Sequence, residues 1–241
     1  MKYVDERILT TFNDRAAIYS DKTNWVDDVE LLNPLVPEKF GNGYFLDVCA
    51  GTGAVTLLAA KKQWIPVSLD VNCHMLAEKP LPLPIIGRME ELPFVDKFFE
   101  MAALRQGLHY TENIQQVLSE MKRVSKKEIR LGTITRAEND DSSFWSDYFA
   151  IASPGRKHIF NPFELGTIAK EMGFHVEYMS TIIKMDYYIG PIMHLPEDVQ
   201  KKLIDLLLKA DDKFKRMYQV TKTTQDEYLY SNRWEFLKLT W

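Results

Sequence analysis

Apolar residues recur at three- and four-residue intervals through the segment 1–36, and Pro37 ends the pattern. This spacing predicts amphipathic helices, which we expect to form an N-terminal helical cap. The same spacing returns at 196–218, where Leu203, Leu207 and Phe214 fall on one stripe, and there it predicts a long amphipathic helix.

Between these helical segments, short apolar runs alternate with helix-forming stretches. The runs predict strands at 44–48, 64–69, 84–86, 98–104, 128–135, 174–183 and 233–241. The intervening patterns predict helices at 54–62, 72–78, 114–124 and 163–172. Strands that alternate with helices in this way predict an α/β fold, with a mostly parallel sheet and helices on both faces.

No repeat, low-complexity tract or flexible linker divides the chain, so a single domain over 1–241 is expected. Within it we expect a core at 40–183, a helical insertion or lid at 186–225 and a last-strand region at 226–241. The lid could cover a substrate pocket or form the face of a homodimer.

Composition narrows the class of protein. The 241 residues carry a formal net charge of −4, which argues against a broad basic surface for nucleic acid. The chain lacks an apolar run long enough to span a bilayer and a signal-peptide pattern at its start, so we expect no membrane partner and a cytoplasmic location. With only Cys49 and Cys73, neither a disulfide framework nor a metal site is expected.

The most informative segment runs from Asp47 to Gly53, between a predicted strand and a predicted helix. Gly51 and Gly53 allow a sharp turn and let a ligand lie directly against the backbone. The next predicted strand ends at Asp70, whose carboxylate can accept two hydrogen bonds from a ribose diol. A dinucleotide fingerprint would require glycine where Thr56 stands. Asp47 would also oppose a pyrophosphate, whereas it suits the ammonium and sulfonium groups of S-adenosylmethionine.

These motifs resemble class I S-adenosylmethionine-dependent methyltransferases, particularly the small-molecule group related to ubiquinone and menaquinone biosynthesis. The likeness covers roughly 40–183 and includes Leu92-Pro93-Phe94. It implies a Rossmann-like, seven-stranded, mostly parallel sheet with an antiparallel last strand and a helical lid. The chain departs from the family pattern at Cys49, which replaces a glycine, and at Arg88, which replaces an aspartate.

The resemblance also implies which residues surround the ligands. Residues expected to contact S-adenosylmethionine are Asp47, Cys49, Ala50, Gly51, Gly53, Asp70, Val71, Met75, Met89, Glu90 and Arg105. Residues expected to contact the acceptor are Tyr19, Gln106 and Tyr110.

The segment 104–110 follows the fourth predicted strand, where the resemblance places the transferable methyl group. His109 is a candidate general base, because an unperturbed imidazole titrates near neutrality. Arg105 would orient the acceptor. The alternative is structural, with His109 capping the following helix or packing on Tyr110.

These features predict an enzyme that transfers a methyl group from S-adenosylmethionine to the oxygen, nitrogen or carbon of a small molecule by in-line displacement. Three alternatives stay open at this point. The chain could be a non-catalytic cofactor-binding or regulatory subunit, a methyltransferase of nucleic acid or protein, or a nicotinamide-dependent oxidoreductase.

Overall fold

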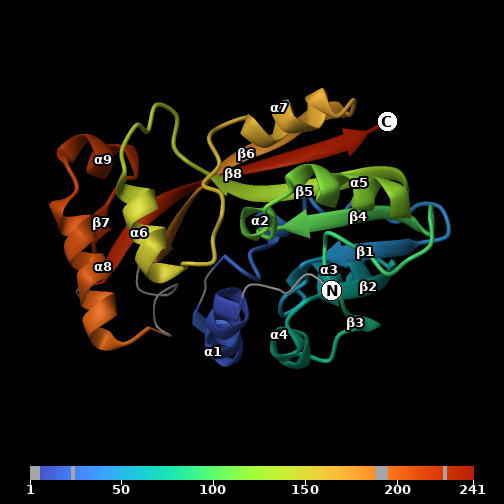
Figure 1. Ribbon diagram of the computed structural model, residues 1–241, viewed down its shortest axis with the longest axis horizontal. Coiled ribbons are helices and arrows are strands. Elements are labelled where there is room, and N and C mark those ends of the chain that lie inside the picture. The colour runs from blue at the N-terminus through green and yellow to red at the C-terminus, as the bar shows by residue number, and fades with distance from the viewer. Residues whose placement is uncertain (1–5, 23–24, 188–194, 225–226) are drawn as a thin grey trace.

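Helices cover both faces of a single sheet (Figure 1). The computed structural model describes the chain except for residues 1–5, 23–24, 188–194 and 225–226. Parts of the predicted cap, of the predicted lid and of the predicted last-strand region therefore lie outside the described residues.

The strands of the sheet are short in its parallel part and long in its antiparallel part. They are β1 (Tyr44–Val48), β2 (Ile65–Asp70), β3 (Pro84–Ile86), β4 (Phe99–Arg105), β5 (Ser125–Thr135), β6 (His175–Tyr187), β7 (Thr221–Lys222) and β8 (Tyr228–Thr240). The helices are α1 (Glu6–Lys22), α2 (Val29–Leu32), α3 (Ala54–Lys61), α4 (Cys73–Ala77), the 3₁₀ turn η1 (Leu108–Tyr110), α5 (Ile114–Val124), α6 (Phe144–Ala152), α7 (Glu164–Glu171), α8 (Glu197–Lys209) and α9 (Asp212–Met217).

The order of the strands positions a crevice. In space the strands run β3-β2-β1-β4-β5-β8-β6, and β7 pairs with β8. The pairings from β3 to β5 are all parallel, and β8 lies antiparallel to both β5 and β6. The chain moves outward from β1 to β3 and then returns to the other side of β1 at β4. Such a reversal opens a crevice at the carboxyl ends of the strands.

Alternation along the strands builds two cores, one on each face of the sheet. Leu46 and Val48 pack with α5 and α7 on one face, where Val117 and Leu165 are buried. Phe45 points to the opposite face, which α2 and α3 cover. Because neighbouring strand residues point to opposite faces, these continuous apolar strands fill both layers.

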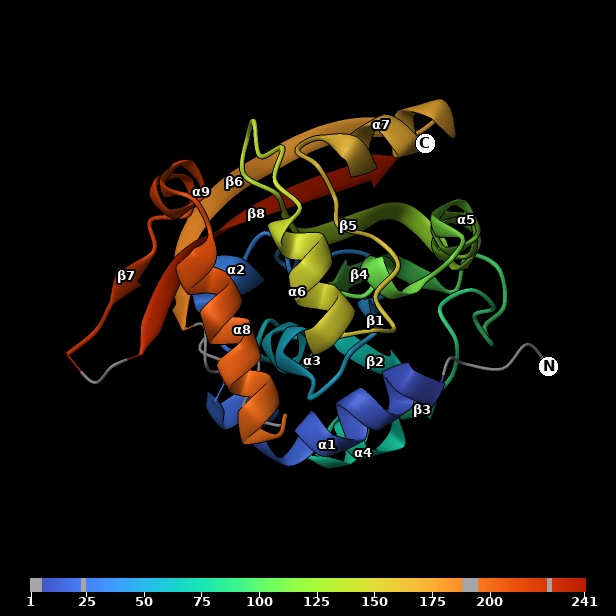
Figure 2. The ribbon, with the colours of Figure 1, turned by 60° about the vertical axis from the view of Figure 1, so that its left-hand side comes forward.

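A third apolar cluster lies apart from these two cores. It joins α6, α8 and α9 to β8 through buried aromatic residues such as Trp145, Phe214 and Tyr230. Figures 1 and 2 both show α6 beside α8, toward the end of the sheet to which β4 points. This cluster therefore stands next to the crevice, and α1 closes another side by packing on α4.

The Rossmann-like fold expected from the sequence is confirmed, including the antiparallel last strand. Three local differences have physical causes. The expected helix at 196–218 is interrupted near Ala210, because Asp211 accepts a hydrogen bond from the Phe214 N–H and starts α9. Helix α6 was not expected, because exposed apolar residues such as Ile151 obscure the helical stripe that Phe144, Tyr148 and Ala152 form. The two-residue β7 adds an eighth strand to the seven expected.

Candidate active site

The loop between β1 and α3 turns sharply at the carboxyl end of β1. Cys49, Gly51 and Gly53 all have positive φ, at 59°, 55° and 82°. The Gly53 N–H donates to the Ala50 carbonyl at 2.8 Å, and α3 begins at the next residue. A Cβ at Gly53 would collide with the side chain of Leu81. The loop therefore needs glycine here for conformation and for space.

Asp47 lies at the base of this loop and is buried. Its Oδ2 accepts hydrogen bonds from the N–H and the Oγ1 of Thr56, at 2.9 and 2.7 Å. Burial raises the pKa of Asp47 to about 7, although Thr56 and the nearby Arg105 oppose the shift. A cation beside this carboxyl would favour its ionised form.

Asp70 ends β2 and ties two loops together. Its Oδ2 accepts from the Gly51 N–H at 2.8 Å, and its Oδ1 accepts from the Asn72 N–H at 2.9 Å. Burial raises the pKa of Asp70, and these backbone hydrogen bonds work against the rise. Each carboxylate oxygen keeps a lone pair for a further donor, such as a ligand hydroxyl.

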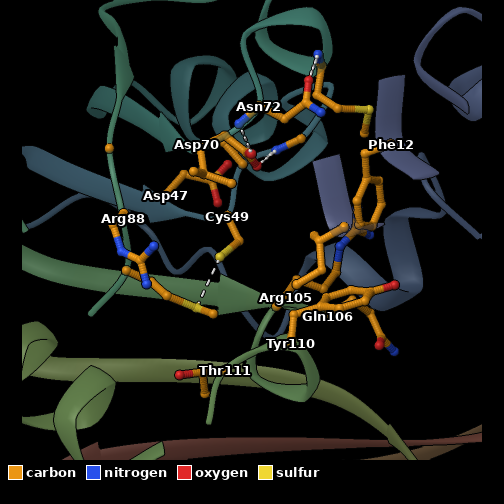
Figure 3. A pocket seen from close by; sticks show the side chains of 18 of the residues that line it. Phe12, Asp47, Cys49, Asp70, Asn72, Arg88, Arg105, Gln106, Tyr110 and Thr111 are labelled. Atoms are coloured by element: carbon orange, nitrogen blue, oxygen red, sulfur yellow. Dashed lines mark hydrogen bonds between the residues drawn. The ribbon is translucent and has the colours of Figure 1, made fainter. Parts of the chain in front are cut away.

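Both carboxylates line one cavity of about 1110 Å³ (Figure 3). The other predicted site residues on its wall are Tyr19, Cys49, Ala50, Gly51, Val71, Met75, Met89, Glu90, Arg105, Gln106 and Tyr110. Gly53 and His109 are the predicted residues that are absent from the described lining of this cavity. Gly53 is the last residue of the loop and directly precedes α3.

Sequence reasoning missed several residues on this wall. Phe12, Trp25 and Asn72 line the cavity, and Phe12 reaches it from α1 (Figure 3). The Asn72 side chain donates to Asn13 Oδ1 at 2.9 Å and accepts from the Met75 N–H at 3.0 Å. It therefore joins the cap to the cofactor side of the cavity. Phe12 belongs to the helical stripe of apolar residues in 1–36, which is the only sequence signal that could have indicated it. That stripe does not distinguish a residue that lines a cavity from one that packs in the core.

The sulfur atoms on the wall are not reactive groups. Cys49 Sγ lies 3.4 Å from Met89 Sδ. Burial raises the pKa of the Cys49 thiol, and the nearby Asp70 and Glu90 raise it further. Cys49 therefore packs as a small neutral side chain. On the same wall, Arg88 pairs with Glu90 at 3.3 Å.

Arg105 and Gln106 mark the end of β4. Arg105 Nη2 donates to the Val26 carbonyl at 2.9 Å, and the guanidinium lies 5.1 Å from the centre of the Trp25 ring. Burial lowers the pKa of Arg105, and Tyr19 and Asp47 counter that effect. Gln106 adopts φ 58°, a backbone conformation that a residue with a side chain adopts rarely and that is found at functional sites.

His109 lies on a second cavity, of about 110 Å³. Burial lowers the pKa of His109 well below 6.5, and Arg156 and Arg15 lower it further, so the imidazole is neutral. Its carbonyl accepts from the Lys157 and His158 N–H groups, and its ring packs on Tyr110 with centres 4.3 Å apart. The structure thus includes the packing expected of a structural histidine, and its catalytic role stays a prediction.

The two cavities adjoin, because five residues line both of them. These shared residues are Phe12, Tyr19, Trp25, Gln106 and Tyr110. The three residues predicted to contact the acceptor are therefore at the junction of the two cavities. The arrangement can hold one ligand against Asp47 and Asp70 and a second beyond Gln106.

Residues 46–131 match the family model described as a methyltransferase domain. The chain is an S-adenosylmethionine-dependent methyltransferase. A demethylmenaquinone methyltransferase of Lactiplantibacillus plantarum is 29% identical over 129 residues, which are 47% of this chain and 54% of that enzyme. An uncharacterized protein of Methanocaldococcus jannaschii is 27% identical over 187 residues, covering 72% of this chain and 80% of that protein. The chain spans 51–60% of the quinone methyltransferases it matches.

Solved structures share the fold of this methyltransferase. The YcgJ protein of Bacillus subtilis superposes with a TM-score of 0.74 at 16% identity, over 90% of this chain and 98% of that one. Phosphoethanolamine N-methyltransferase 2 of Haemonchus contortus, in complex with S-adenosyl-L-methionine, gives 0.57 at 17% identity, over 90% and 52%. At these identities the likeness concerns the fold alone.

The wall of the large cavity fits S-adenosylmethionine, the cofactor of this methyltransferase. Asp47 and Asp70 suit a ligand that carries cationic groups and a ribose diol but no phosphate. Asp47 Oδ1 accepts no hydrogen bond from the described residues.

Across the described part of the methyltransferase, no group of three His, Cys, Asp or Glu residues could hold a metal ion. No helix in that part is long and apolar enough to cross a bilayer.

Proposed function

We propose that this methyltransferase transfers a methyl group to a small-molecule acceptor that binds in the second cavity and meets the cofactor at the junction. The observation that carries the proposal is the continuity of the two cavities through Tyr19, Gln106 and Tyr110. A cavity with two carboxylates adjoins a smaller one walled by aromatic residues.

Each residue of the large cavity has a distinct part in the proposal. Asp70 binds the ribose hydroxyls, and its backbone hydrogen bonds from Gly51 and Asn72 fix the carboxylate for that purpose. Asp47 faces the cationic end of the ligand. Met75, Met89 and Val71 pack on the adenine, and Glu90 lies beside them on the same wall.

The bound cofactor supplies an electrophilic methyl group on a sulfonium. The protein's contribution is to position the acceptor and to exclude water, and oriented encounter can lower a barrier by about 7–11 kcal/mol. Gln106 and Tyr110 hold the acceptor at the junction, and Arg105 fixes the neighbouring wall of the large cavity through its contacts with Val26 and Trp25. His109, as a neutral imidazole, can accept a proton from the acceptor or orient it.

The segment α8–α9 would act as the lid of the second cavity. It packs on α6 through Leu203 and Leu207, and Phe214 contacts Phe144 with ring centres 4.2 Å apart. The quinone methyltransferases among the relatives favour an aromatic acceptor, and the aromatic wall of the second cavity agrees with that choice.

Calorimetric titration tests the first requirement of the proposal, which is that the protein binds the cofactor. S-adenosylmethionine should bind, and NAD should not. Asp70→Ala should weaken cofactor binding by about 1.5–3 kcal/mol, the range of hydrogen bonds to charged groups. Asp205→Ala, an exposed change on α8, is the matched control and should bind as the wild type. Absence of any heat with S-adenosylmethionine would instead favour a non-catalytic subunit.

A further inference from the structure

The second cavity has the size of a single aromatic ring. Its volume is about 110 Å³, somewhat below the roughly 150 Å³ of an apolar cavity that holds benzene. It lies where α6 meets β8 and the residue after α9, and it opens toward the large cavity at Gln106 and Tyr110. A ligand larger than one ring must extend through this opening.

Flat side chains form the walls. Trp145, Tyr148 and Phe149 come from α6, while Tyr218 directly follows α9 and Tyr230 lies on β8. The Trp145 ring centre lies 5.3 Å from that of Tyr218 and 5.5 Å from that of Tyr230. Such walls favour a planar ring, since aromatic pairs gain from offset and edge-to-face contacts.

The charges around this cavity are of one sign. Arg15, Arg136 and Arg156 line it, and its described lining includes no Asp or Glu. Arg136 is paired with Asp140 at 3.6 Å. No carboxylate of the described residues lies within ion-pair distance of the other two arginines, Arg15 and Arg156.

Both unpaired arginines are held in place by aromatic rings. The Arg156 guanidinium lies 3.9 Å from the centre of the Phe149 ring, and its Nε donates to the His158 carbonyl at 2.9 Å. The Arg15 guanidinium lies 5.1 Å from the centre of the Tyr19 ring. Each of the two also lowers the pKa of His109, so their charges act on the same small volume.

Two residues on the wall of this cavity, Gln106 and His109, carry buried polar atoms without a hydrogen-bond partner among the described residues. His109 is buried, and its Nδ1 has no hydrogen-bond partner among the described residues. The same holds for the buried Nε2 of Gln106. Since an unpaired buried polar atom is costly, these atoms indicate a ligand that supplies hydrogen-bonding oxygens.

We propose that the second cavity binds its acceptor as a single aromatic ring carrying an anionic oxygen, which Arg156 and Arg15 hold while the aromatic side chains enclose the ring. The proposal rests on the proposed function, since it assigns the acceptor class of that site. It excludes amines, whose positive charge would meet two arginines without a carboxylate between them. Both a carboxylate and a phenolate supply the required charge.

Ligand-observed NMR titration of the full chain, with and without S-adenosylhomocysteine, tests this assignment. The carboxylate arm compares benzoate with benzamide, and the phenolate arm compares a nitrophenolate with nitrobenzene. Within at least one pair the anion should bind at least tenfold more tightly than its neutral counterpart, and benzylamine should bind more weakly than either member. Equal binding within both pairs, or no binding by either anion, overturns the proposal.

Substitutions of single residues test which side chains cause the preference for the anion. Arg156→Gln and Arg15→Gln should each reduce the affinity of the preferred anion at least fivefold and leave its neutral counterpart unchanged. Lys202→Gln removes the same charge from an exposed position on α8 and should change nothing. If both arginine variants still prefer the anion over its neutral counterpart, the proposal is contradicted. If a variant fails to fold, the ligand pairs measured with the wild-type protein still decide the proposal. Cofactor binding is measured in a separate titration, so a failure of the proposed function can be distinguished from a failure of this inference.

Discussion

Thr56 donates two hydrogen bonds to one oxygen of Asp47, from its N–H at 2.9 Å and from its Oγ1 at 2.7 Å. Thr56 Oγ1 also lies 3.0 Å from Ser68 Oγ. A residue in the first turn of α3 thus fixes a carboxylate on β1. The other carboxylate oxygen accepts no hydrogen bond from the described residues, so it is free to meet a cation.

The raised pKa of Asp47 makes cofactor binding depend on pH. A cationic ligand stabilises the ionised carboxylate, so affinity should rise as pH increases through about 7. If only the ionised form binds, the change between pH 6 and pH 8 is about tenfold. Calorimetry across this range should show it, with release of a proton on binding below pH 7. Asp47→Asn should bind the cofactor more weakly, and its affinity should lack the pH dependence that Asp47 causes. The cofactor's own amine also titrates, but that effect is the same for both proteins.

The same group should affect the stability of the cofactor-free protein in the opposite sense. The folded pKa of Asp47 lies above its unfolded value, so the folded state holds an extra proton between about pH 4 and pH 7. Its contribution to stability is present at low pH and is lost as pH rises through about 7. Chemical denaturation should therefore show Asp47→Asn gaining stability relative to wild type as pH rises. A constant difference over this range would contradict the raised pKa.

Removing the Thr56 hydroxyl should weaken cofactor binding without removing a contact to the ligand. Thr56→Val keeps the backbone hydrogen bond and the shape but loses the Oγ1 donor, so the pKa of Asp47 should rise further. At neutral pH we expect a loss of about 1–1.5 kcal/mol in calorimetry, and the pH dependence should move upward. Thr167→Val, on the exposed surface of α7, is the matched control. An unchanged pH midpoint would show that Thr56 does not tune Asp47.

The sequence allowed prediction of the sheet and of one wall of the site. Asp47 lies one residue before the end of β1 and Asp70 ends the adjacent parallel strand β2, so the alternation of strands and helices was sufficient to bring them together. The second cavity could not be predicted in this way. Its walls combine α1, α6 and β8, which are far apart in the chain, and contacts of that kind depend on packing rather than on local pattern. For the same reason, Arg156 and Phe149 gave no signal in the sequence.

Gly53 should be less tolerant of substitution than a glycine of similar backbone geometry. Gly53 and Gly173 have nearly equal φ, 82° and 80°, but a Cβ would collide with Leu81 only at Gly53. Gly173→Ala should show the conformational strain alone, about 1 kcal/mol in the free energy of unfolding. Gly53→Ala should lose more, because the loop or Leu81 must also move. Equal losses in denaturant titrations would mean that the loop has room for a side chain.

His109 should contribute to turnover and not to cofactor binding, since it lines only the second cavity. His109→Ala should lower kcat by about a hundredfold if the imidazole removes a proton from the acceptor, the lower range for general-base catalysis. Because burial and two arginines lower its pKa well below 6.5, the wild-type kcat at saturating cofactor should stay level through neutrality and fall only at more acidic pH. His109→Gln separates the roles, because it keeps a hydrogen-bonding group but cannot act as a base. If His109→Gln restores the wild-type rate, His109 orients the acceptor and does not take its proton.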